Sequence, residues 1–146
     1  MKPDLKRLAE QLQNVIAMRI VRKLCDECKI AYTPHPKLLQ QLGIPQGRIR
    51  QFYKAFEYEP GMVDENEQEI DPCRDCSGIG YQGRTGIFEV LTLNDELRQV
   101  LAKNPRMESL SAIARKHRHI SMRDMGVLAV ASGTTSLEEV QRVLKK

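Results

Sequence analysis

Four cysteines, arranged as two Cys-x-x-Cys pairs, are the clearest chemical signal in the sequence: Cys25 with Cys28, and Cys73 with Cys76. A Cys-x-x-Cys turn brings two thiolates close enough to bind one tetrahedral ion, at about 2.3 Å from each sulfur. Two such turns supply four ligands, which saturate zinc and leave no coordination position for water. The spacing therefore predicts a structural zinc site rather than a catalytic one.

Two other uses of these cysteines are a redox pair and a set of unbound structural thiols. A redox Cys-x-x-Cys typically opens a helix that follows a strand in a thioredoxin-like unit, and neither pair has that context. The pairs are separated by 44 residues, so a shared ion would close a long loop of the chain. Metal binding, worth on the order of 10 kcal/mol, could offset the entropy cost of that closure.

The three histidines are weaker candidates for metal ligands. His35 lies between two prolines near the first pair and would be a ligand only if one cysteine were not. His117 and His119 are two positions apart near a basic helix end, so they do not face each other on a helix. We expect these two side chains to lie on the surface or to interact with the helix dipole.

The motifs that catalysis would need are missing from these 146 residues. No G-x-x-x-x-G-K-[ST] loop is present to bind phosphates, and neither H-E-x-x-H nor G-x-S-x-G occurs. Residues 90–96 resemble a Walker B strand. A strand followed by an N-capped helix with acidic residues in its first turn accounts for the same residue types. The chain taken alone is therefore not predicted to be an enzyme, and we assign it no catalytic or nucleotide-binding residues.

Composition and charge limit the possible partners and compartments. The net charge is +4, tryptophan is absent and aromatic residues make up 5%, a composition that does not point to nucleic acid. No apolar run approaches the roughly 18–20 residues of a membrane span, and no signal-peptide core follows the charged N-terminus. We expect a cytoplasmic protein, whose reducing environment favours metal binding over disulfides.

Local patterns predict mainly helices with a small β element, an α+β fold. A helix is expected over 5–24, with short helices over 37–42 and 47–56. An acidic loop follows over 57–71, where seven acidic residues occur without lysine or arginine. Glycines mark a turn-rich passage over 73–86, and residues 87–93 have the β-branched and aromatic content of a strand.

Capping signals predict a helical bundle at the C-terminal end. Asn94 is a suitable N-cap for a helix over 95–103, and a second helix is expected over about 108–117. Ser121 begins a third helix that Gly133 would end, and Ser136 with Glu139 forms a capping box for a fourth. The expected organisation is a helix over 1–24, a four-cysteine zinc module over 25–86, and a strand with a helical bundle over 87–146.

The order of these features resembles a known family. A run ending in the first cysteine pair is followed by Tyr32-Thr33-Pro34, and the second pair continues into a glycine-rich turn and a strand over 73–91. Residues 122–126 (MRDMG) and 133–140 (GTTSLEEV) complete the pattern. Together they are similar to the C-terminal part of the GspE/PilB-like ATPases, which drive type II secretion and type IV pilus assembly. The similarity extends from about residue 8 to 144.

The resemblance implies that the nucleotide-binding motifs lie upstream of this region, so that ATP and Mg²⁺ bind only in the intact parent protein. It also implies a hexameric motor, peripheral to the inner membrane, with zinc held by Cys25, Cys28, Cys73 and Cys76. The partners that it implies are the upstream ATPase core, neighbouring subunits of a homohexamer and an inner-membrane platform protein. This region would then have a structural and subunit-interaction role.

Two other functional classes are also compatible with these residues. Cys73-x-x-Cys76-x-Gly78-x-Gly80 is the repeat unit of DnaJ-type chaperone zinc domains, although those domains repeat it and this chain has it once. A zinc-containing nucleic-acid-binding module is the other alternative. Its support is the stretch 98–123, which carries seven lysines and arginines against one acidic residue, Glu108.

Overall fold

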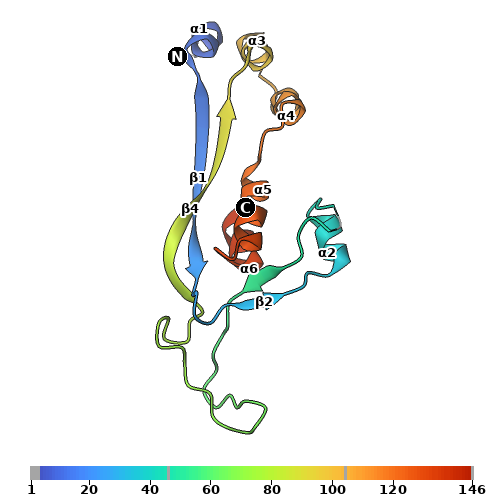
Figure 1. Cartoon of the computed structure of the whole chain (residues 1–146). Helices are drawn as coiled ribbons and strands as arrows, with labels where there is room; N and C mark the ends of the chain where they lie inside the picture. Colours follow the sequence, from blue (N-terminus) through green and yellow to red (C-terminus); the bar gives the residue numbers. More distant parts are fainter. Residues whose placement is uncertain (1–3, 46, 104, 146) are drawn as a thin grey trace. The chain divides into compact units, whose positions relative to one another are not determined.

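The structure is a computed structural model that describes residues 4–45, 47–103 and 105–145 (Figure 1). The described residues contain helices and small two-stranded sheets joined by turns and irregular segments, which confirms the predicted α+β class. The chain divides into two compact units. The smaller unit comprises residues 4–18 and 88–122, and the larger unit comprises residues 19–87 and 123–145, leaving residue 104 out of the first and residue 46 out of the second. No helix of the described ranges is long and apolar enough to cross a membrane.

The helix expected over 5–24 is wrong beyond its first turns. Helix α1 covers only Leu5–Gln11, with Asp4 as its N-cap, and strand β1 follows over Asn14–Leu24. Strand β4 (Tyr81–Thr92) pairs with β1, and it starts before the predicted strand at 87. The apolar residues of 15–21 are largely β-branched, which favours a strand once a partner is available. Residues 1–3 of the predicted segment lie outside the described residues.

Three short helices build the smaller unit. Helix α3 (Asp95–Lys103) packs against both α1 and α4 (Met107–Lys116). The Asn94 side chain accepts a hydrogen bond from the Leu97 amide at 2.9 Å, which confirms the predicted cap. The buried side chains of this unit include Ala9, Leu93, Leu97 and Ala114.

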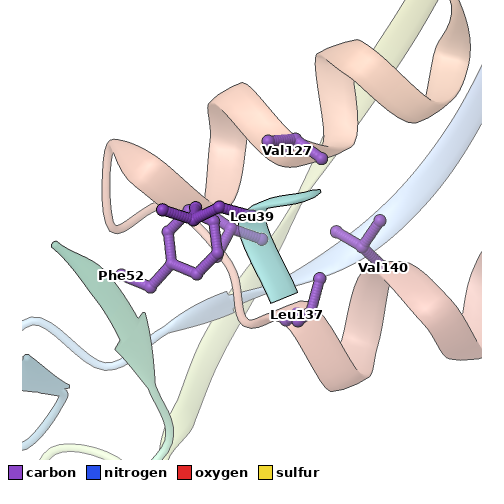
Figure 2. Close-up of a cluster of buried hydrophobic side chains, with 6 residues drawn as sticks. Leu39, Phe52, Val127, Leu137 and Val140 are labelled. Carbon is purple, nitrogen blue, oxygen red and sulfur yellow. The ribbon is translucent and has the colours of Figure 1, made fainter. Parts of the chain in front are cut away.

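The larger unit has an apolar core of its own. Strand β2 (Ile30–Tyr32) pairs antiparallel with β3 (Phe52–Lys54), placing Ala31 opposite Tyr53. Helix α2 (Pro36–Gln41), helix α5 (Met122–Ala131) and helix α6 (Leu137–Leu144) complete the unit. The core cluster, most of it shown in Figure 2, consists of Leu39, Phe52, Val127, Val130, Leu137 and Val140.

The predicted helix over 47–56 is also wrong, because residues 52–54 form β3. Phe52 is fully buried in the core, and the ring of Tyr32 meets it edge-on with centroids 6.1 Å apart. A strand is favoured here because it pairs with β2 and delivers Phe52 to the core, which outweighs local helix propensity. The last predicted helix is confirmed, since the Ser136 hydroxyl accepts the Glu139 amide at 3.1 Å.

A candidate metal centre at the end of a two-stranded sheet

The two cysteine pairs meet because the strands that lead to them are neighbours. Strand β1 ends at Leu24, directly before Cys25, and β4 begins at Tyr81, shortly after Cys76. The Cys25 amide donates to the Gly80 carbonyl at 3.0 Å, so the ladder of the sheet continues into the turns that carry the cysteines. All of these residues belong to the larger unit.

The sulfur atoms have the spacing that a tetrahedral ion requires. The Sγ atoms of Cys25 and Cys73 are 3.9 Å apart, those of Cys28 and Cys76 are 3.6 Å apart, and all four lie within 4.8 Å of one another. Sulfurs bound to zinc at 2.3 Å in a tetrahedron are about 3.8 Å apart. A disulfide would require about 2.05 Å, and all four cysteines are free. The four predicted residues therefore form one group that fits a single metal ion.

The second cysteine turn is shaped by glycines. The Gly80 amide donates to Cys76 Sγ at 3.2 Å, and the Gly78 amide donates to the Cys73 carbonyl at 3.2 Å. Gly80 has φ +76°, and a Cβ there would lie 2.7 Å from the Phe56 carbonyl oxygen. Glycine is needed at this position because the backbone conformation and the close approach both exclude a side chain.

Burial and hydrogen bonding shift the pKa values of Cys25, Cys28 and Cys76. Burial raises the pKa of the fully buried Cys25 thiol, and burial also raises the pKa of Cys28. At Cys76 burial opposes ionisation as well, but the Gly80 amide and the neighbouring thiols outweigh it and lower the pKa to about 7. Most of these protons must therefore leave when a cation binds, because thiolates are the ligands.

The histidines have other roles than metal binding in this structure. His35 is the N-cap of α2, where its Nδ1 accepts a hydrogen bond from the Lys37 amide at 3.2 Å. His117 lies 3.2 Å from a Glu96 carboxylate oxygen, and His119 lies 2.8 Å from that of Glu89. The candidate metal group contains only cysteines among the described residues.

A buried carboxylate next to this region was not expected from the sequence. Glu139 is fully buried, and its oxygens accept from the Arg22 amide at 3.0 Å, from the Arg22 guanidinium and from the Arg142 guanidinium at 2.7 and 2.8 Å. The Arg22 guanidinium also lies 4.0 Å above the Tyr81 ring, and the Tyr81 hydroxyl is 2.7 Å from that of Ser136. These contacts fix the end of β1 and the start of β4 to α6. The only sequence signal was the capping-box position of Glu139, which does not reveal a partner 117 residues away.

Known proteins resemble this chain over most of its length. It is 34% identical over 141 residues to the type II secretion system protein E of Dickeya dadantii. This match covers 95% of this chain and 24% of that protein. It is 30% identical over 135 residues to the type IV pilus assembly ATPase PilB of Thermus thermophilus, covering 91% of this chain and 14% of that protein. The type II secretion system ATPase E of Vibrio cholerae is 31% identical, over 95% of this chain and 24% of its own length.

The chain thus spans less than a quarter of the length of these relatives. The sequence model of one family, described as type II/IV secretion system protein, matches residues 1–142. This match covers both cysteine pairs, the paired strands and helices α1 to α5. The chain therefore belongs to the type II/IV secretion system protein family.

Proposed function

We propose that Cys25, Cys28, Cys73 and Cys76 hold one structural zinc ion in a part of a secretion or pilus-assembly ATPase that does not itself bind ATP. The observation that carries the proposal is the sulfur geometry, since separations of 3.6 and 3.9 Å fit a tetrahedral zinc–thiolate site. An all-cysteine set favours zinc over the hard cations that prefer oxygen ligands.

A zinc ion bound by four thiolates has no open position, so it supplies a cross-link and no reaction. The residues that benefit from a cross-link are those between the cysteine pairs. Between residues 55 and 80 the chain has no helix or strand, and its buried residues are Cys76, Gly78 and Gly80 (Figure 1). Since no large apolar side chain is buried in this segment, the ion would provide the main restraint on it.

The activity of the whole protein follows from its relatives and is part of the proposal. Relatives that match 91% to 95% of this chain carry the names type IV pilus assembly ATPase, type II secretion system ATPase and type II secretion system protein. The intact parent would hydrolyse ATP with Mg²⁺ in a segment outside residues 1–146, as a cytoplasmic homohexamer peripheral to the inner membrane. This region would contact that ATPase core, the neighbouring subunits and an inner-membrane platform protein.

A nucleic-acid-binding module is less well supported. Two cations of the stretch 98–123 are engaged within their own unit: Lys116 pairs with Glu96 at 2.8 Å, and Arg98 donates to the Ala9 carbonyl. A shift in DNA mobility that weakens with added salt would favour this alternative.

The test of the proposal is a metal stoichiometry. Purified chain should contain one zinc per molecule, measured by elemental mass spectrometry, and Cys73→Ser should lose it. Asp75→Asn is the matched control, because it alters the same turn and leaves all four sulfurs in place. Chain that folds with the same stability at zero zinc would contradict the structural site.

A second experiment separates a specific role in the motor from simple maintenance of the fold. In cells, Cys28→Ser in the intact ATPase should reduce secretion or piliation by more than it reduces protein abundance, since rigidity between subunits is lost. If the two fall in proportion, the site only keeps the region folded, and the subunit-interaction role is wrong.

A further inference from the structure

An open apolar groove lies on the surface of the larger unit, between the end of α2 and the helices α5 and α6. Its volume is about 530 Å³, within the range of small-molecule binding sites. The floor of the groove is apolar and consists of Leu42, Val127, Leu137, Val140 and Leu144. Figure 2 shows three of these side chains, Val127, Leu137 and Val140, on the facing helices α5 and α6.

This groove is a fixed part of the unit. Three of its floor residues belong to the buried core cluster, and the other two pack against that cluster. Helices α5 and α6 approach each other closely at Gly126, where a Cβ would lie 2.6 Å from Val140 Cγ1. Because the core already holds the floor in place, a ligand can bind there without rearranging it, which favours affinity.

The polar side chains around this floor are cationic or neutral. Arg123 on α5 and Lys145 after α6 line the groove together with Gln141, and none of its described lining residues is acidic. Arg123 also donates to the Gln41 carbonyl at 2.7 Å, which holds its guanidinium next to the end of α2. The matching ligand therefore has an apolar body and an anionic end, since guanidinium and ammonium groups bind carboxylates with charge-assisted hydrogen bonds.

The size of the groove favours a small molecule over a protein. A standard protein interface uses roughly 20–30 residues on each side, whereas eight of the described residues line this groove. An alkyl chain that ends in a carboxylate meets both chemical requirements, because its methylene groups gain from leaving water and its head is negative.

We propose that this groove binds the anion of a fatty acid, with the alkyl chain on the apolar floor and the carboxylate at Arg123 and Lys145. The inference goes beyond the proposed function and does not depend on the metal site, because no cysteine lines the groove. A bound chain would contact α5 and α6 together and so stabilise the folded larger unit.

The test is a titration of the purified 146-residue chain with decanoate, below the concentration at which it forms micelles. The methyl resonances of Val127, Val140 and Leu144 should shift and saturate, and the melting temperature should rise with decanoate concentration. Decyltrimethylammonium has the same alkyl chain with a positive head, and it should bind about tenfold more weakly or worse. Equal affinity for the two probes, or shifts that do not saturate, would overturn the proposal.

Variants test the two ends of the site separately. Arg123→Gln and Lys145→Gln should each weaken decanoate binding about threefold, as expected for exposed ion pairs, and Lys54→Gln should not. Lys54 is an exposed cation of the same unit that lies outside the groove. Leu144→Glu should abolish binding, whereas Leu128→Glu should not, because Leu128 is 52% exposed on α5 and does not line the groove. Controls that weaken binding as much as their partners would contradict the site.

Two other outcomes would assign the groove to a different occupant and overturn the proposal. One is a dimer of the 146-residue chain that Leu144→Glu abolishes, because a second copy would then fill the groove. The other is binding to phosphatidylglycerol vesicles that Leu144→Glu abolishes, without saturable binding of decanoate, because the occupant would then be a membrane lipid.

Discussion

Two regions of the larger unit are held together in different ways. The cysteine region, residues 25–28 and 55–80, consists of turns and a single isolated bridge, and buries no large apolar side chain. The core of β2, β3, α2, α5 and α6 contains six buried apolar residues in one cluster (Figure 2). If the four sulfurs bind one ion as proposed, a segment too poor in apolar residues to fold by burial would be ordered by the ligands that it supplies.

Removing the metal should produce the largest effect. Chelation of the zinc-loaded chain should abolish hydrogen-exchange protection in residues 55–80 and leave most of it in α5 and α6. The reason is that zinc binding to such sites is worth on the order of 10 kcal/mol and the cysteine region has no other large stabilising term. Uniform loss of protection in both regions would show that the core also depends on the ion.

Phe52→Ala should produce the opposite pattern. Truncating this fully buried ring removes about 3–5 kcal/mol of unfolding free energy, measured by urea denaturation of the zinc-loaded chain. The zinc content of the folded protein should stay at one per chain. Phe88→Ala is the control, because a ring that is 45% exposed should cost about 0.5 kcal/mol or less.

Acid should weaken the attachment of β1 to α6 through Glu139. The hydrogen bonds from Arg142 and Arg22 outweigh burial and lower the pKa of Glu139 to about 2, against an ordinary value of 4.5. A lowered pKa stabilises the fold above the ordinary value, and that contribution is lost as the pH falls from about 4.5 towards 2. At 1.36 kcal/mol per pKa unit, it amounts to about 3 kcal/mol.

Glu139→Gln should therefore be less stable than the parent at pH 7, and its stability should depend less on pH below 5. Zinc release in acid affects both proteins equally, so the informative quantity is the difference between their unfolding free energies at each pH. A difference that stays constant from pH 7 to pH 3 would contradict the lowered pKa.

Features set by residues close together in the sequence could be predicted, whereas features that depend on residues far apart in the sequence could not. The cysteine group and the caps at Asn94 and Ser136 were predictable, because metal ligation and capping need particular residue types at fixed local spacing. Strand β1 was not, since its apolar spacing also fits a helix and its partner β4 begins more than fifty residues later. The contact between Arg22 and Glu139 was missed because nothing local marks it.

The smallest expected effect tests whether the backbone geometry of the second cysteine turn contributes to stability independently of the ion. Gly80 and Gly83 both have φ +76°, so alanine at either position pays the same backbone cost of about 1 kcal/mol. Only at Gly80 would the new Cβ meet neighbours, at 2.7 Å from the Phe56 carbonyl oxygen, whereas Gly83 has nothing within 4 Å. Gly80→Ala should therefore be less stable than Gly83→Ala by about 1–2 kcal/mol. It should also lose zinc to a chelator faster, because the shifted backbone weakens the amide hydrogen bond to Cys76 Sγ. Equal stability and equal zinc loss in the two variants would mean that the ion alone shapes this turn.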